Sequence, residues 1–217
     1  MRRVVVQTLL IALVAARAAA QSAEADSSSR REPSSQSETW SGRGSTAFYA
    51  LPDAKNYLQP TAAADRDALH LEMRYNYEAQ NSVSGFVGRN VAFGTSVVLR
   101  MTPMLGGLVG DTTGIIPALE LDLAWKRLEF YTEGEYVIDV IHPSDRFLYS
   151  WSETSVWITD RIRTGVVTQR TRAFHAPRDI RRGLLLGATV TRFEGAVYFF
   201  NPNSNDRFYV ASIGVTF

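Results

Sequence analysis

Charged side chains recur at every second position in several short segments of this 217-residue chain. In "LHLEMRYNYE" the charges of Glu72 and Arg74 alternate with Leu71, Met73 and Tyr75. Carboxylates and guanidinium groups placed on one face can pair with each other or can line a water-filled passage. The positions that this alternation assigns to the charged face are Glu72, Arg74, Glu120, Asp122, Glu129, Glu133, Glu135 and Asp139.

Two further groups could do chemistry. His142 and Ser144, with Glu153 further along, provide the residue types of a hydrolytic triad. Their spacing loosely resembles that of outer-membrane lipid A deacylases, although Pro143 and the flanking residues depart from that family. Guanidinium groups that could bind phosphate cluster near one connection, at Arg170, Arg172, Arg178, Arg181 and Arg182.

Composition excludes several kinds of site. The chain has no cysteine, so disulfides and cysteine metal ligands are absent. Its 23 basic residues nearly balance 22 acidic ones, which gives no indication of nucleic-acid binding. No phosphate-binding glycine loop or metal-binding motif occurs, and we expect neither a metal nor another cofactor.

The segments that must position these charges are strands. Alternation with a period of two predicts β-strands that have one apolar and one charged face, and helical spacing fits none of these runs. About ten such segments follow residue 68, with eight as the alternative, and short turns alternate with longer polar connections. This rhythm predicts an all-β, antiparallel up-and-down barrel that crosses a membrane.

The segments before residue 68 differ in kind. Residues 1–20 carry two early arginines, an apolar run and a closing Ala-Ala-Ala, a pattern typical of a cleaved secretory signal peptide. Residues 21–67 are rich in Ser, Glu and Arg, which predicts a mobile polar tail. The barrel is therefore assigned to residues 68–217.

The chain ends in "RFYVASIGVTF", with apolar residues at alternate positions up to the terminal aromatic. This ending resembles the C-terminal signature of bacterial outer-membrane β-barrel proteins. The matching residues are Tyr209, Ala211, Ile213, Val215 and Phe217. In that family the barrel-assembly machinery recognises this segment, so the resemblance implies an outer-membrane location in a Gram-negative cell. Aromatic residues beside the tight turns, at Phe93, Trp125, Trp157 and Phe193, predict an interfacial girdle.

An even number of strands places both termini on the short-turn side, which would be the periplasm. We expect a structural barrel or a narrow porin-like pore without catalysis, its interior filled by salt bridges rather than open, because small barrels are filled by side chains. The arginine cluster would bind lipopolysaccharide at the outer leaflet. A lipid A-modifying enzyme and a soluble periplasmic β-barrel binding protein remain the alternatives, and the oligomeric state is open.

Overall fold

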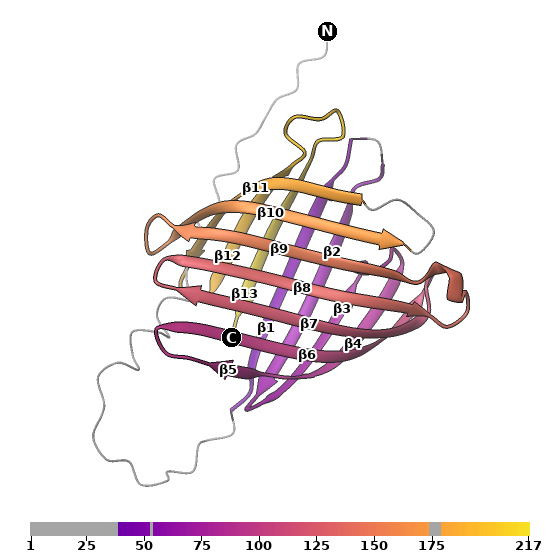
Figure 1. The fold of residues 1–217 in the computed structure, drawn as a ribbon, viewed down its shortest axis with the longest axis horizontal. Coiled ribbons are helices and arrows are strands. Elements are labelled where there is room, and N and C mark those ends of the chain that lie inside the picture. Colours follow the sequence, from indigo (N-terminus) through magenta and orange to yellow (C-terminus); the bar gives the residue numbers. More distant parts are fainter. Residues whose placement is uncertain (1–38, 53, 174–178) are drawn as a thin grey trace.

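The computed structural model describes residues 39–52, 54–173 and 179–217. These residues form antiparallel strands that wrap into a closed barrel (Figure 1). The elements are β1 (Ser41–Ala50), β2 (Tyr57–Arg66), β3 (Leu69–Tyr75), β4 (Ser82–Arg89), β5 (Val91–Phe93), β6 (Val97–Gly110), β7 (Gly114–Trp125), β8 (Leu128–Asp139), the 3₁₀ turn η1 (Pro143–Asp145), β9 (Phe147–Trp157), β10 (Ile162–Ala173), β11 (Asp179–Val190), β12 (Phe193–Phe200) and β13 (Phe208–Thr216).

Two pairings close the barrel. Strand β1 pairs with β13, from Arg43 opposite Thr216 to Ala50 opposite Tyr209. Strand β4 pairs with β6, and the short β5 continues along β6 with Val91 opposite Met101. Twelve strands therefore close the barrel and β5 is additional, so the antiparallel barrel is confirmed but the prediction of about ten strands, or eight, is wrong.

The barrel begins at Ser41, within the segment that the sequence assigned to a tail. Strands β1 and β2 occupy residues 41–50 and 57–66 and pair with each other over most of their length. Their sequences, "SGRGSTAFYA" and "YLQPTAAADR", contain mainly small residues on both faces, so they lack the contrast that reveals a strand. The signal segment 1–20 lies outside the described residues.

The two ends of the barrel have connections of different length. The turns at 67–68, 126–127, 158–161 and 191–192, and the β4–β6 connection at 90–96 that contains β5, lie at one end, which we call the short-turn rim. The connections at 51–56, 76–81, 111–113, 140–146 and 201–207, most of them longer, lie at the other end, the long-loop rim, where β10 also ends and β11 begins. Ser41 lies opposite Asp65, and Phe217 follows directly after β13, so β1 begins and β13 ends at the short-turn rim.

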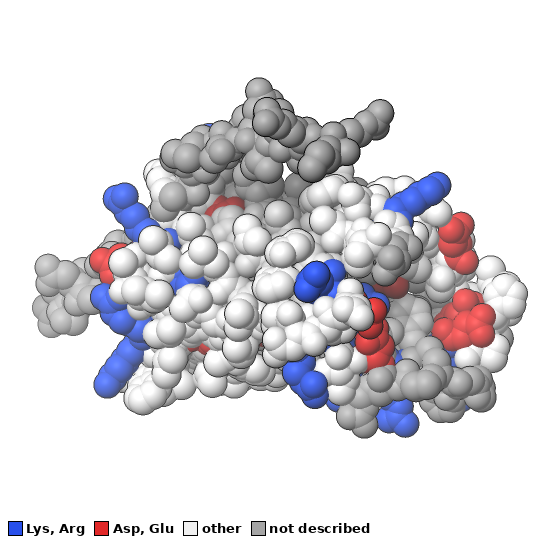
Figure 2. Space-filling model, turned by 90° about the horizontal axis from the view of Figure 1, so that it is seen from above, with Lys and Arg blue, Asp and Glu red and all other residues white. Residues whose placement is uncertain are grey.

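The strands are apolar outside and charged inside. Along β3, Leu69, Leu71, Met73 and Tyr75 are exposed, whereas the intervening His70, Glu72 and Arg74 are buried. On the face seen in Figure 2, Lys, Arg, Asp and Glu gather towards the two ends and leave a broad uncharged band between them. No helix in the described part of the chain is long and apolar enough to cross a membrane.

The last residue of the chain is held by the first strand. The Phe217 amide donates to the carbonyl of Gly42 at 2.9 Å, and the Gly42 amide donates to the carbonyl of Phe217 at 2.8 Å. A Cβ atom on Gly42 would lie 2.2 Å from the Phe217 ring, so the ring occupies the space that this glycine leaves. The C-terminal strand is thus ordered to its end by barrel closure.

Candidate functional site

The buried Arg74 of β3 lies inside the barrel. Its guanidinium forms ion pairs with Glu72 on its own strand and with Glu133 and Glu135, which β8 contributes from elsewhere in the barrel wall. Nitrogen–oxygen distances of 3.6 Å to Glu78 and 3.7 Å to Glu120 bring in two further carboxylates. We call this set of one arginine and five glutamates the Arg74 cluster.

Aromatic side chains surround the Arg74 cluster. The guanidinium carbon of Arg74 lies 4.5 Å from the ring centres of both Tyr77 and Phe86. The hydroxyls of Tyr77 and Tyr131 donate to Glu133 at 2.9 and 3.2 Å. Only 1% of the Arg74 side chain is exposed, so carboxylates and aromatic rings surround this guanidinium in place of water.

Glu78 joins the Arg74 cluster from the β3–β4 connection rather than from a strand. Burial raises the pKa of its carboxyl, and this effect outweighs the opposing attraction of Arg74. The Ser84 hydroxyl donates to its carboxyl oxygens at 2.8 and 2.9 Å. A connection at the long-loop rim thereby folds an acid back into the interior.

A second polar network is centred on Glu153 of β9. Its carboxylate accepts hydrogen bonds from Trp151 Nε1 at 2.9 Å, from the Tyr198 hydroxyl at 2.8 Å and from Arg163 at 2.7 Å. The sequence assigned Glu153 only to a candidate triad. Tyr198 is 45 residues from Glu153 in the chain, and the order of the strands around the barrel brings its hydroxyl to this carboxylate. The period-two pattern of the sequence does not indicate which strands meet.

Apolar side chains fill the interior beside these networks. One buried cluster contains Tyr49, Tyr149, Trp151, Val167, Leu185, Ala196, Tyr198, Phe200, Phe208 and Val210. The other contains Phe86, Met104, Leu108, Ile116, Ala118 and Val137. The rings of Phe200 and Phe208, at the long-loop ends of their strands, stack at 4.7 Å. The interior on the long-loop side is therefore packed like a protein core.

Towards the short-turn rim the interior is polar and more open. Arg100 pairs with Asp122 at 3.0 Å, and 49% and 19% of these two side chains are exposed. The predicted lumenal Glu129 is half-buried near the short-turn end of β8, and the predicted lumenal acid Asp139 lies at its long-loop end. Asp139 accepts the amides of Ile141 and His142 at 2.8 and 2.7 Å, so it caps a turn. The other five predicted lumenal residues, Glu72, Arg74, Glu120, Glu133 and Glu135, meet in the Arg74 cluster.

The candidate hydrolytic triad is not assembled. Ser144 is exposed in η1, and its hydroxyl donates to Asp145 at 2.9 Å. Glu153 is buried inside the barrel and is engaged by the network described above. No group of His, Cys, Asp or Glu suited to hold a metal occurs within residues 39–52, 54–173 and 179–217.

The arginine cluster is divided by the barrel wall. Arg172 and Arg182 are exposed and Arg170 is half-buried, whereas Arg178 lies outside the described residues. Arg181 lies over the buried Phe208 ring, 5.3 Å from its centre, and pairs with Asp179 at 2.9 Å. Because the Phe208 ring lies inside the barrel, Arg181 faces the interior and not the outer surface that the sequence predicted.

The residues of the predicted assembly signal lie along the outer face of β13 and at its end. Tyr209 and Ile213 are exposed, Val215 is half-buried and Phe217 is 72% exposed. Tyr209 stacks on Phe199 of β12 with ring centres 4.8 Å apart. Recognition of this segment by assembly machinery stays a prediction.

This chain resembles known proteins in its fold rather than in its sequence. No protein-family model matches the chain, and no curated protein matches its sequence. Among solved structures, the KdgM porin superposes with a TM-score of 0.55 and 12% identity over 82% of this chain and 99% of its own. The NanC porin gives a TM-score of 0.50 and 13% identity over the same shares. The chain therefore has the barrel fold of these porins.

Proposed function

We propose that this protein is an integral outer-membrane β-barrel of porin-like architecture whose lumen is narrow and obstructed. The observation that carries the proposal is the Arg74 cluster, which spans the interior between β3, β7 and β8 with Arg74 1% exposed. The fold shared with the KdgM and NanC porins supports a membrane barrel. In this orientation the short-turn rim and both termini face the periplasm.

The outer face favours a membrane protein over a soluble periplasmic barrel. Large apolar side chains are exposed around the wall, including Met73 at 60%, Leu105 at 57% and Leu186 at 58%. Soluble monomers rarely expose contiguous apolar patches beyond a few hundred Å². Lipid removes the cost of such a surface, which a soluble barrel would leave exposed to water.

The charges of the Arg74 cluster favour cations in whatever passage remains. Five carboxyl groups lie around Arg74, and Arg43 is a second guanidinium near Glu120 and Glu72. Arg100 and Asp122 closer to the short-turn rim balance each other, so acids remain in excess. A narrow passage beside an excess of acid attracts cations and repels anions.

Single-channel recording on the purified full chain in planar bilayers tests this proposal. We expect conductance steps well below those of the KdgM porin recorded alongside, with a reversal potential that indicates preference for cations. Glu120→Gln, at the edge of the Arg74 cluster, should weaken the preference. Asp160→Asn is the control, since that side chain is 86% exposed at the short-turn rim. Large, unselective steps would contradict an obstructed lumen.

The proposal includes no catalysis. Lipid A isolated from cells with and without the protein should have the same acyl pattern by mass spectrometry. A changed pattern that disappears in Ser144→Ala would establish the enzyme alternative instead.

A further inference from the structure

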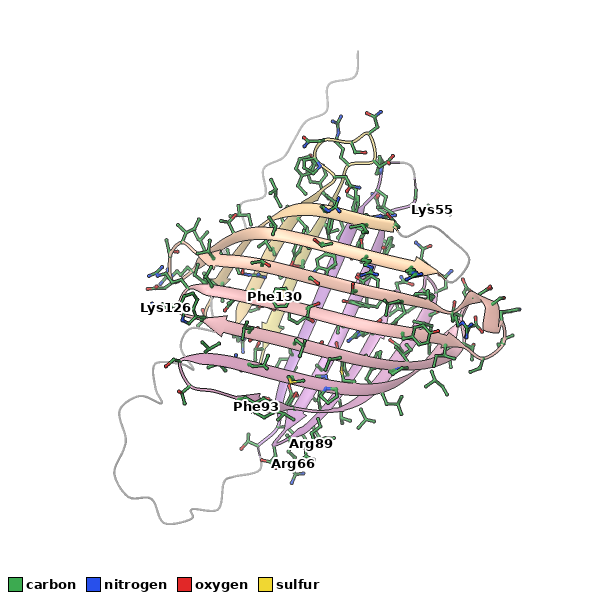
Figure 3. The ribbon with its side chains drawn as sticks, viewed as in Figure 1. Lys55, Arg66, Arg89, Phe93, Lys126 and Phe130 are labelled. Atoms are coloured by element: carbon green, nitrogen blue, oxygen red, sulfur yellow. The ribbon has the colours of Figure 1, made fainter. Side chains whose placement is uncertain are left out.

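We infer that the short-turn rim binds the phosphate headgroups of anionic phospholipids in the leaflet that surrounds it. This inference rests on the proposed membrane location and adds a lipid-binding surface to it. The basic residues in the turns of this rim, or directly adjoining them, are Arg66, Arg89, Lys126, Arg127, Arg161 and Arg192. Figure 3 shows Lys126 at the β7–β8 turn and Arg66 beside Arg89 at the same rim, with Lys55 at the opposite end.

The charge of the two rims differs in sign. By the same definition the short-turn rim has two acids, Asp67 and Asp160, against its six basic residues. The described part of the long-loop rim has three basic residues, Lys55, Arg146 and Arg207, against six acids. Those acids are Glu78, Asp111, Asp139, Asp145, Asp179 and Asp206. Among the described residues, the excess of positive charge therefore lies at the short-turn rim.

Three basic groups of the short-turn rim lie on aromatic rings at the edge of the apolar band. The Lys126 ammonium lies 5.2 Å from the Trp125 ring centre, and the Arg192 guanidinium 5.4 Å from that of Phe193. Arg66 lies 5.9 Å from the ring of Trp40, which is 46% exposed. Interfacial rings hold the depth of a barrel in the bilayer, and a cation stacked on such a ring is held at headgroup level.

At this level, neighbouring strands place two guanidinium groups on either side of one apolar side chain. Arg66 and Arg89 are both paired with Leu69, one from each side, and Leu69 is exposed on the outer face. Two guanidinium groups that flank an apolar side chain present donors for a phosphate above a surface for an acyl chain. This combination matches a phospholipid better than it matches free phosphate.

Arg127 is the member whose charge is already engaged. It donates to the carbonyls of Trp157 and Ile158 at 3.2 Å and pairs with Asp160 at 3.3 Å. Its contacts tie the β7–β8 turn to the β9–β10 turn. The variant that tests the rim therefore leaves Arg127 in place and changes the exposed Arg89, Lys126, Arg161 and Arg192.

The test titrates the full chain in a neutral detergent with phosphatidylglycerol, phosphatidylcholine or inorganic phosphate. The readouts are the thermal midpoint of the barrel and the lipid retained in native mass spectra. Phosphatidylglycerol should bind and raise the midpoint, and the other two should not. In Arg89→Gln/Lys126→Gln/Arg161→Gln/Arg192→Gln its affinity should fall by about tenfold or more.

The control removes two exposed charges of the long-loop rim, as Lys55→Gln/Arg207→Gln. It should retain phosphatidylglycerol binding within about twofold. Equal losses in both variants, or equal binding of phosphatidylcholine by the wild type, would overturn the assignment to this rim. Recovery of the wild type as a soluble protein would instead refute the membrane proposal.

Discussion

The two faces of β3 have opposite chemistry within a single strand. Leu71 and Met73 face outward and are 39% and 60% exposed, whereas Glu72 and Arg74, their sequence neighbours, are 7% and 2% exposed inside. A soluble protein distributes such residues the other way round. The alternation along β3 therefore meets two requirements: its apolar residues can contact lipid outside, and its charged residues can form ion pairs inside.

The largest change expected on the inner face comes from Arg74→Gln. Removal of the guanidinium leaves buried carboxylates without their cation, which typically costs about 3–5 kcal/mol in unfolding free energy. Urea unfolding of the barrel in detergent micelles measures this cost. The control Arg100→Gln removes an arginine that is 49% exposed, and it should cost less than about 1 kcal/mol. Similar small losses in both would show that the cluster does not hold the interior.

The outer face is tested by Leu105→Arg in the middle part of β6. A charge that faces lipid near the bilayer centre destabilises a barrel by about 2–4 kcal/mol. Leu128→Arg lies directly after the 126–127 turn, at the level of the headgroups, and it should cost about 0–1 kcal/mol. Unfolding in lipid vesicles compares the two, and equal costs would mean that depth in a bilayer is irrelevant.

Sequence alternation predicted the inward acids because charged and apolar residues contrast sharply on β3 and β8. It missed β1 and β2 because Gly42, Gly44 and Ala47 give no such contrast. It also missed which charges meet, since Arg74 reaches Glu133 across 59 residues and only the strand register determines that pairing. Arg181 was placed outside because its segment was assigned to a connection, whereas β11 begins at Asp179 and directs this side chain inward.

A smaller effect on the inner face is expected for Tyr198→Phe. This variant removes one donor to Glu153 but keeps the ring against Trp151, 5.1 Å between centres. We expect a loss of about 1–2 kcal/mol, because Trp151 and Arg163 still satisfy the carboxylate. Tyr209→Phe on the outer face should change stability by less than about 0.5 kcal/mol. A larger loss of stability for Tyr209→Phe than for Tyr198→Phe would contradict the greater contribution of the inner face to stability.

The smallest effect on stability is expected at the long-loop end of the outer face. Arg172→Gln/Arg182→Gln should reduce co-purifying lipopolysaccharide, with about 1 kcal/mol of binding lost per charge, and should leave the thermal midpoint unchanged. Arg181→Gln is the control, because Arg181 lies over the interior ring of Phe208. If the amount of co-purifying lipopolysaccharide is unchanged in the double variant, Arg172 and Arg182 do not bind it and are only solvated.

Cysteine scanning of β3 tests the central claim most directly, because the chain has no cysteine of its own. Single cysteines at positions 69–75, spin-labelled in reconstituted vesicles, report contact with lipid-soluble oxygen or with a water-soluble relaxation agent. We expect oxygen contact at 69, 71, 73 and 75 and low access to both agents at 70, 72 and 74. Access of the water-soluble agent to 71 and 73 would contradict a lipid-facing wall, and a barrel with an open lumen would admit it at 72 and 74.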